Sequence, residues 1–139
     1  MIVVDAGALA AVLFLEAGYE PTLARIGEAP LCAPTLLPYE LTNIRIVKER
    51  RQPSLAAALA LQFDAFLRLD IDYVTPFQPE VAALARRYAV TAYDAAYLWL
   101  ALTRSLPLVT IDSRLHTAWQ QATAPHPSLV PILERTLGV

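Results

Sequence analysis

The chain has 139 residues, of which 56% are hydrophobic, and its formal net charge is −2 at pH 7. This length fits one globular domain and is too short for two ordinary ones, so we expect a single domain over residues 1–139. The apolar stretches are too short, or too often interrupted by proline, for a membrane span. The charge balance gives no sign of nucleic-acid binding, so any basic surface must be local.

Short apolar runs alternate with helical patterns along the chain. The opening "MIVVDAGALAAVLFL" has no basic residue before its apolar part and contains Asp5, so it indicates a strand leading into a helix and not a secretory signal. We expect buried strands at residues 2–5, 30–34 and 106–112, and a half-exposed strand at 70–74. We expect helices at residues 6–16, 21–28, 35–51, 54–69, 79–89 and 92–104. The final residues, 126–139, suggest one more short strand and a terminal turn or helix.

Strands that alternate with helices are typical of a parallel α/β sheet with helices on both faces. The third helix should end before Pro53, and Ser54 is the predicted N-cap of the next helix. Cys32 is the only cysteine, which excludes an internal disulfide framework and fits a reducing cytoplasm. The apolar share exceeds the roughly 45–50% of typical domains, so we expect a homodimer or burial by a partner chain.

Three acidic residues stand at the ends of predicted elements. Asp5 and Asp112 follow two of the most apolar strands, at the carboxyl edge where parallel sheets bind ligands. Glu40 sits beside an apolar helical stripe and shares a helix face with Asn43. Each acid has a local explanation, because carboxylates also cap helix N-termini.

Asp94 is the only residue from 92 to 102 that is neither apolar nor aromatic. It lies three residues after Thr91, the spacing of a capping box. Local capping does not explain why four apolar elements carry their lone acid where one site could form. Carboxylates about 5 Å apart repel by about 3 kcal/mol per pair at an effective dielectric near 20, so the cluster needs a cation or bound protons. Oxygen ligands favour Mg²⁺ or Mn²⁺.

Four segments in order, "VVDAGAL", "PYELTN", "TAYDAAYLWLA" and "LVTIDSRL", resemble the acidic motifs of the PIN-domain ribonucleases. In size and layout the chain is similar to the VapC toxins of toxin–antitoxin pairs, over nearly its whole length. The resemblance implies a three-layer PIN-like α/β fold, with a central parallel sheet and helices on both faces. It also implies a cytoplasmic endoribonuclease with an RNA substrate and a VapB-type antitoxin as partner.

By the same resemblance, one or two Mg²⁺ or Mn²⁺ ions would be held by the four acids Asp5, Glu40, Asp94 and Asp112. Asn43 and Thr110 would lie in or near the site. The sequence departs from the family at Gly7, where Ser or Thr is usual, so one hydroxyl near the metal is missing. A bound ion would activate water for phosphodiester hydrolysis.

A basic cluster ends the Glu40 helix and could hold RNA phosphates, or could simply complement the helix C-terminus. Its members are Arg45, Lys48, Arg50 and Arg51. Three aromatic residues, Tyr93, Tyr97 and Trp99, are expected to pack in the core or an interface rather than stack on bases. His116 and His126 lack metal-ligand spacing.

Two other functions compete with hydrolysis of RNA. Asp70 and Asp72 resemble the D-x-D of aspartyl-phosphate phosphatases, but they alternate with apolar residues and do not end a buried strand. A phospho-receiver domain needs a lysine that ends a late strand, and Lys48, the only lysine, lies on a predicted helix. A non-catalytic PIN-fold interaction module with an idle site is the remaining alternative, and the presence of all four acids disfavours it.

Overall fold

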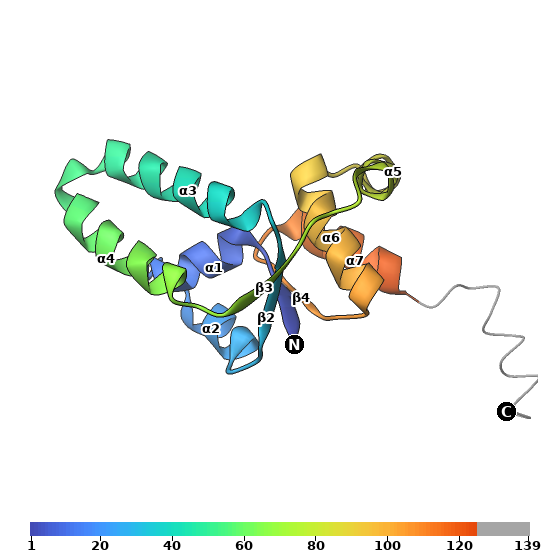
Figure 1. Cartoon of the computed structure of the whole chain (residues 1–139), viewed down its shortest axis with the longest axis horizontal. Helices are drawn as coiled ribbons and strands as arrows, with labels where there is room; N and C mark the ends of the chain where they lie inside the picture. The colour runs from blue at the N-terminus through green and yellow to red at the C-terminus, as the bar shows by residue number, and fades with distance from the viewer. Residues whose placement is uncertain (125–139) are drawn as a thin grey trace, which may run out of the picture.

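A four-stranded parallel sheet with the strand order β3-β2-β1-β4 organises the computed structural model, which describes residues 1–124 (Figure 1). The strands are β1 (Ile2–Val4), β2 (Leu31–Pro34), β3 (Ile71–Val74) and β4 (Leu108–Val109). Val3 pairs with Cys32 on one side and with Leu108 on the other. Because all pairings are parallel, the carboxyl ends of the four strands meet at one edge of the sheet.

Helices cover both faces of this sheet and make the three-layer α/β arrangement that the sequence predicts (Figure 1). One layer holds α1 (Ala6–Leu13), α2 (Glu20–Ile26), α3 (Leu37–Arg51) and α4 (Ala56–Leu67). The other holds α5 (Gln78–Tyr88), α6 (Ala92–Arg104) and α7 (Ser113–Thr123). Among residues 1–124, no helix has the length and apolar character needed to cross a membrane.

The core lies where α6 packs on β1 and β2. Every residue from Ala95 to Ala101 on this helix is buried, which accounts for its nearly continuous apolar sequence. The strands Ile2–Val4 and Leu31–Pro34 are buried throughout, as expected for central parallel strands. In β3, at the sheet edge, only Ile71 is buried, in agreement with the half-exposed strand predicted there.

The first helix is shorter than the predicted 6–16, because the chain leaves the helix at a left-handed turn. Leu15 has φ +50°, its N–H donates to the carbonyl of Val12, and the Glu16 N–H donates to the carbonyl of Ala11. This pair of bonds is the Schellman arrangement, which usually has glycine at the left-handed position. Because leucine stands at that position instead of glycine, the sequence does not indicate where the helix ends.

Two further expectations at element ends are wrong. Ser54 does not cap α4, because a 3₁₀ turn over Pro53–Leu55 includes Ser54 and puts Leu55 at the helix start without a side-chain cap. The last strand spans only Leu108–Val109 and not 106–112. The chain turns at Thr110 toward α7, because the Thr110 hydroxyl oxygen accepts a hydrogen bond from the backbone N–H of Asp112. The strand and helix predicted in residues 126–139 lie outside the described residues.

Candidate active site

Asp5 occupies the junction between β1 and α1 at the carboxyl edge of the sheet. Its Oδ1 accepts a hydrogen bond of 2.8 Å from the backbone N–H of Ala8, so it caps α1. Its Oδ2 accepts a hydrogen bond from the hydroxyl of Thr110, which directly follows β4. Only 6% of Asp5 is exposed, and the helix N-terminus and the threonine both favour its ionised form.

Thr110 connects Asp5 to Asp112. While its hydroxyl donates to Asp5, its Oγ1 accepts the backbone N–H of Asp112 at 3.0 Å. Asp112 in turn caps α7, because its Oδ1 accepts the Leu115 N–H at 2.9 Å. The helix-capping role foreseen for these aspartates therefore coexists with a common position at the sheet edge.

Glu40 lies on α3, where Leu36 and Leu37 begin the helix, and its carboxylate turns toward α6. The hydroxyl of Tyr97 donates a 2.7 Å hydrogen bond to Glu40 Oε1. Tyr97 is only 1% exposed, and burial together with the Glu40 charge raises the pKa of its hydroxyl, so the hydroxyl remains protonated and donates. Tyr97 packs in the core as predicted, but its contact with an acid was not foreseen. No local sequence signal marks this contact, because Glu40 lies 57 residues before Tyr97.

Asp94 lies in the first turn of α6, and its backbone N–H donates to Thr91 Oγ1 at 3.1 Å. This is the N-cap that the T-x-x-D spacing predicts. Burial raises the pKa of the Asp94 carboxyl, and the charge of Asp112 raises it further. The capped helix start therefore holds Asp94 within electrostatic reach of the sheet edge.

Electrostatic effects link the acids of the four elements. Burial raises the pKa of Asp5, and the charges of Asp94 and Asp112 add to that rise. Burial also raises the pKa of Glu40, with further increases from Asp94 and Asp5. The fold therefore gathers acids from four different elements into one negatively charged cluster.

The cluster has the donor chemistry for a hard divalent ion, but it is not a closed cage. Within residues 1–124, no three His, Cys, Asp or Glu side chains are grouped closely enough to hold an ion together. Mg²⁺ usually keeps several waters and takes only one or two protein carboxylates. The residues present fit such a hydrated ion, with some of the acids acting through water.

Asn43 lines a hollow of about 460 Å³ beside Glu40. The other lining residues are Leu36, Tyr39, Ile44 and Tyr93. Tyr93 is 66% exposed, so it is not a core residue, and its packing in an interface stays a prediction. Trp99 is buried and donates to Glu80 at 2.6 Å. Tyr39 was not singled out in the sequence, since one exposed aromatic residue carries no pattern.

Two of the four predicted phosphate-binding cations have protein partners. Arg45 pairs with Glu49 at 2.8 Å and lies over the ring of Phe63. Lys48 pairs with Glu16 at 2.7 Å and lies over the ring of Phe14. These contacts hold α3 to α4 and to the end of α1.

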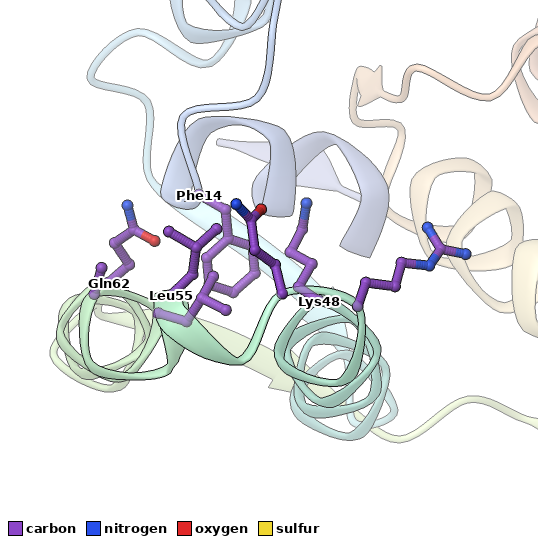
Figure 2. A pocket seen from close by; sticks show the side chains of 8 residues that line it. Phe14, Lys48, Leu55 and Gln62 are labelled. Atoms are coloured by element: carbon purple, nitrogen blue, oxygen red, sulfur yellow. The ribbon is translucent and has the colours of Figure 1, made fainter.

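Arg50 and Arg51 are exposed and form no ion pair with another residue in the described part of the chain. Lys48 and Arg51 line a cleft of about 350 Å³ between the end of α1 and the α3–α4 connection. Figure 2 shows Phe14 reaching into this cleft between Lys48 and Leu55. Arg50 and Arg51 therefore leave two cations, unpaired within the described residues, available to a polyanion at the end of α3.

The phosphatase motif does not form a site. Asp70 precedes β3 and Asp72 lies in its first half, whereas the acids of such a motif should end a strand. Asp72 binds Arg104 at 2.5 Å, and Arg104 also contacts the buried Cys32. His116 stacks on Trp119, and His126 lies outside the described residues.

A family model described as "PIN domain" matches residues 2–118 of this sequence. The chain belongs to the PIN domain family. Members of this family are generally metal-dependent nucleases. The crystal structure of PAE2754 from Pyrobaculum aerophilum is similar, with 28% sequence identity and a TM-score of 0.67. The similarity covers 84% of this chain and 83% of that one. No curated protein matches the sequence.

Proposed function

We propose that this PIN domain is an endoribonuclease that depends on Mg²⁺ or Mn²⁺ and hydrolyses RNA phosphodiester bonds. The observation that supports this most strongly is the raised pKa of Asp5, Glu40 and Asp94, to which burial contributes first and the charges of neighbouring acids, including Asp112, contribute further. A divalent cation bound beside such acids offsets their charge.

The residues of the chain divide the work of such a reaction. Asp5, Glu40, Asp94 and Asp112 would hold the ion directly or through water. Thr110 orients Asp5 and Tyr97 orients Glu40 by donating hydrogen bonds to their carboxylates. When bound, a divalent ion supplies activation of water and neutralisation of charge on the phosphate. Burial raises the pKa of Glu40, which makes this carboxylate a better acceptor for a proton of the attacking water.

Cleavage of single-stranded RNA by the purified protein, with Mg²⁺ or with EDTA, tests the proposal. Asp5→Asn and Asp94→Asn should each retain the fold and abolish cleavage, because each removes a negative charge from the cluster. Asp70→Asn is the matched control: it removes an exposed carboxylate at the opposite end of β3 and should cleave like the wild type. Mg²⁺-dependent cleavage retained in both site variants would refute the proposal.

We further propose that the protein is the toxin of a VapBC pair, forms a homodimer and binds a VapB-type antitoxin. The support is the four-motif resemblance together with exposed apolar side chains on α4. Leu61 is 71% exposed and Leu67 is 65% exposed, and Figure 1 shows α3 and α4 lying together at one end of the molecule. Such exposure is typical of surfaces that another chain covers.

Light scattering at tens of micromolar and co-purification with the product of a neighbouring gene test this second proposal. A dimer that becomes monomeric in Leu61→Asp/Leu67→Asp, and a small partner that inhibits cleavage, are the expected results. A monomer with no such partner would leave a nuclease outside any toxin–antitoxin pair.

A further inference from the structure

Two exposed tyrosines line the hollow beside Glu40. Tyr39 is 80% exposed and Tyr93 is 66% exposed, and both border the same space of about 460 Å³. Each directly precedes an acid of the cluster, Tyr39 before Glu40 and Tyr93 before Asp94. The hollow therefore adjoins the acidic cluster through the backbone of two helices, α3 and α6.

The charge and polarity of the residues that line the hollow favour an uncharged aromatic ligand. Its charged lining group is the carboxylate of Glu40, which repels a phosphate and tolerates an uncharged ring. Tyrosine faces offer a flat apolar surface on which a nucleobase stacks, whichever base it is. Asn43 adds a side-chain amide that both donates and accepts, as the edge of a base requires.

The size and place of the hollow agree with this ligand. Its volume lies within the roughly 300–1,000 Å³ of small-molecule sites. A base held there would leave its own phosphate outside the hollow, on the side of the acidic cluster, where a bound divalent ion would offset the charge of the acids. A stretch of apolar peptide would also cover the tyrosines, but it would leave Asn43 and Glu40 without partners for their polar atoms.

We propose that Tyr39 and Tyr93 form a base-stacking subsite that holds one unpaired nucleotide of single-stranded RNA beside the acidic cluster. This inference rests on the proposed nuclease function and adds to it a site for one base of the substrate. In a duplex, neighbouring bases cover both faces of each base, so the subsite requires an unpaired strand. It is sequence-tolerant, because stacking uses the base face and only Asn43 contacts an edge.

Binding without cleavage tests the subsite. Fluorescence anisotropy with a short labelled single-stranded RNA in EDTA measures affinity while the divalent ion is absent. Tyr39→Ala and Tyr93→Ala should each weaken binding by roughly fivefold to a hundredfold, the range for loss of one aromatic stacking partner. Tyr39→Phe and Tyr93→Phe keep the ring and should bind within about twofold of the wild type.

Phe77→Ala is the matched control, because Phe77 is 56% exposed and lies outside the hollow. It should bind RNA like the wild type. An abasic scan of the RNA against the wild-type protein gives a second measurement that needs no variant to fold. One abasic position should weaken binding to the extent that the alanine variants do, and the alanine variants should be insensitive to that same position.

Wild-type affinity in folded alanine variants, or an abasic scan with no sensitive position, would overturn the subsite. Alanine variants that keep RNA affinity and lose a protein partner would also overturn it, and would assign the hollow to protein binding. Affinity is measured without hydrolysis, so the two proposals can fail separately. RNA cleavage by a protein whose RNA binding does not depend on the tyrosines would refute the subsite and support the nuclease function. Tyrosine-dependent RNA binding by a protein that does not cleave RNA would support the subsite and refute the nuclease function.

Discussion

Tyr97→Phe removes the hydrogen bond that ties α6 to Glu40, together with the contact of the same hydroxyl with the Ala6 backbone. The substitution removes the hydroxyl that donates to Glu40 Oε1 at 2.7 Å and leaves the ring, which is 1% exposed, in its core position. Packing is therefore conserved and the change acts on the polar contacts of the hydroxyl alone.

The expected loss of stability follows from the charge on the acceptor. Hydrogen bonds to ionised groups contribute roughly 1.5–3 kcal/mol each. Glu40 is half-buried, so water can replace part of the lost contact and we expect about 1–2 kcal/mol. The sign of the pH dependence is also fixed. Burial raises the pKa of Glu40, and the Tyr97 bond lowers it, so the bond favours the ionised carboxylate. The difference between wild type and variant should be full at pH 7 to 8 and shrink as Glu40 becomes protonated.

Urea unfolding of the metal-free protein at pH 7.5 and at pH 5, with cleavage measured across the same pH range, tests both parts. Without the hydroxyl the pKa of Glu40 rises further, so the acidic limb of the kcat/KM profile should move to higher pH. Tyr88→Phe is the control, since in residues 1–124 its hydroxyl makes no hydrogen bond with the protein. A variant with wild-type stability at both pH values and an unmoved acidic limb would refute the reasoning.

Three further predictions concern the metal and the groups around Asp5. Burial raises the pKa of Asp5, Glu40 and Asp94, so metal-free stability should be highest in mild acid and fall as pH rises through these pKa values. Mg²⁺ or Mn²⁺ should therefore raise the melting temperature most at pH 7 to 8, because at one hundred times Kd the bound ion stabilises the folded protein by about 2.7 kcal/mol. The increment should shrink at pH 5 and be lost in Asp112→Asn, and an equal shift in that variant would place the ion elsewhere. Gly7→Ser should be accepted, because an added Cβ would lie 3.7 Å from Ile111 and 3.9 Å from Asp5 Oδ1. The variant should bind Mg²⁺ more tightly than the wild type, as measured by calorimetry. Unchanged or weaker binding would contradict a role for the missing hydroxyl. Thr110→Val should cost about 1–3 kcal/mol in denaturant unfolding, because it leaves a buried Asp5 oxygen without its donor; unchanged stability would contradict the assigned bond.

The order of strands and helices and the gathering of the four acids could be predicted from sequence. Apolar runs, helical periods and the rule that parallel strands end at one edge are enough for that. Element ends were less predictable. The left-handed Leu15 and the 3₁₀ turn at Ser54 depend on hydrogen bonds between backbone groups, which composition does not reveal.

The partners of the site residues were the hardest to foresee. Tyr97 and Glu40 are 57 residues apart, and nothing in either local sequence indicates which buried tyrosine meets which acid. The basic cluster shows the converse case. Its spacing suggested a free phosphate-binding surface, but two of its cations form ion pairs with Glu16 and Glu49. Distant contacts of this kind are fixed only when the tertiary packing is complete.

The long reach of the site contacts has a consequence during synthesis on the ribosome. Thr110 binds Asp5 across 105 positions of sequence, and the first strand obtains its second neighbour only when β4 arrives. A nascent chain that ends before Leu108 lacks the strand that completes this edge, together with Thr110 and Asp112. Parallel pairings between such distant segments also form late, because the loop between them must close first. The nascent chain therefore cannot assemble its full set of acids until Asp112 has left the exit tunnel, which would delay the proposed nuclease activity.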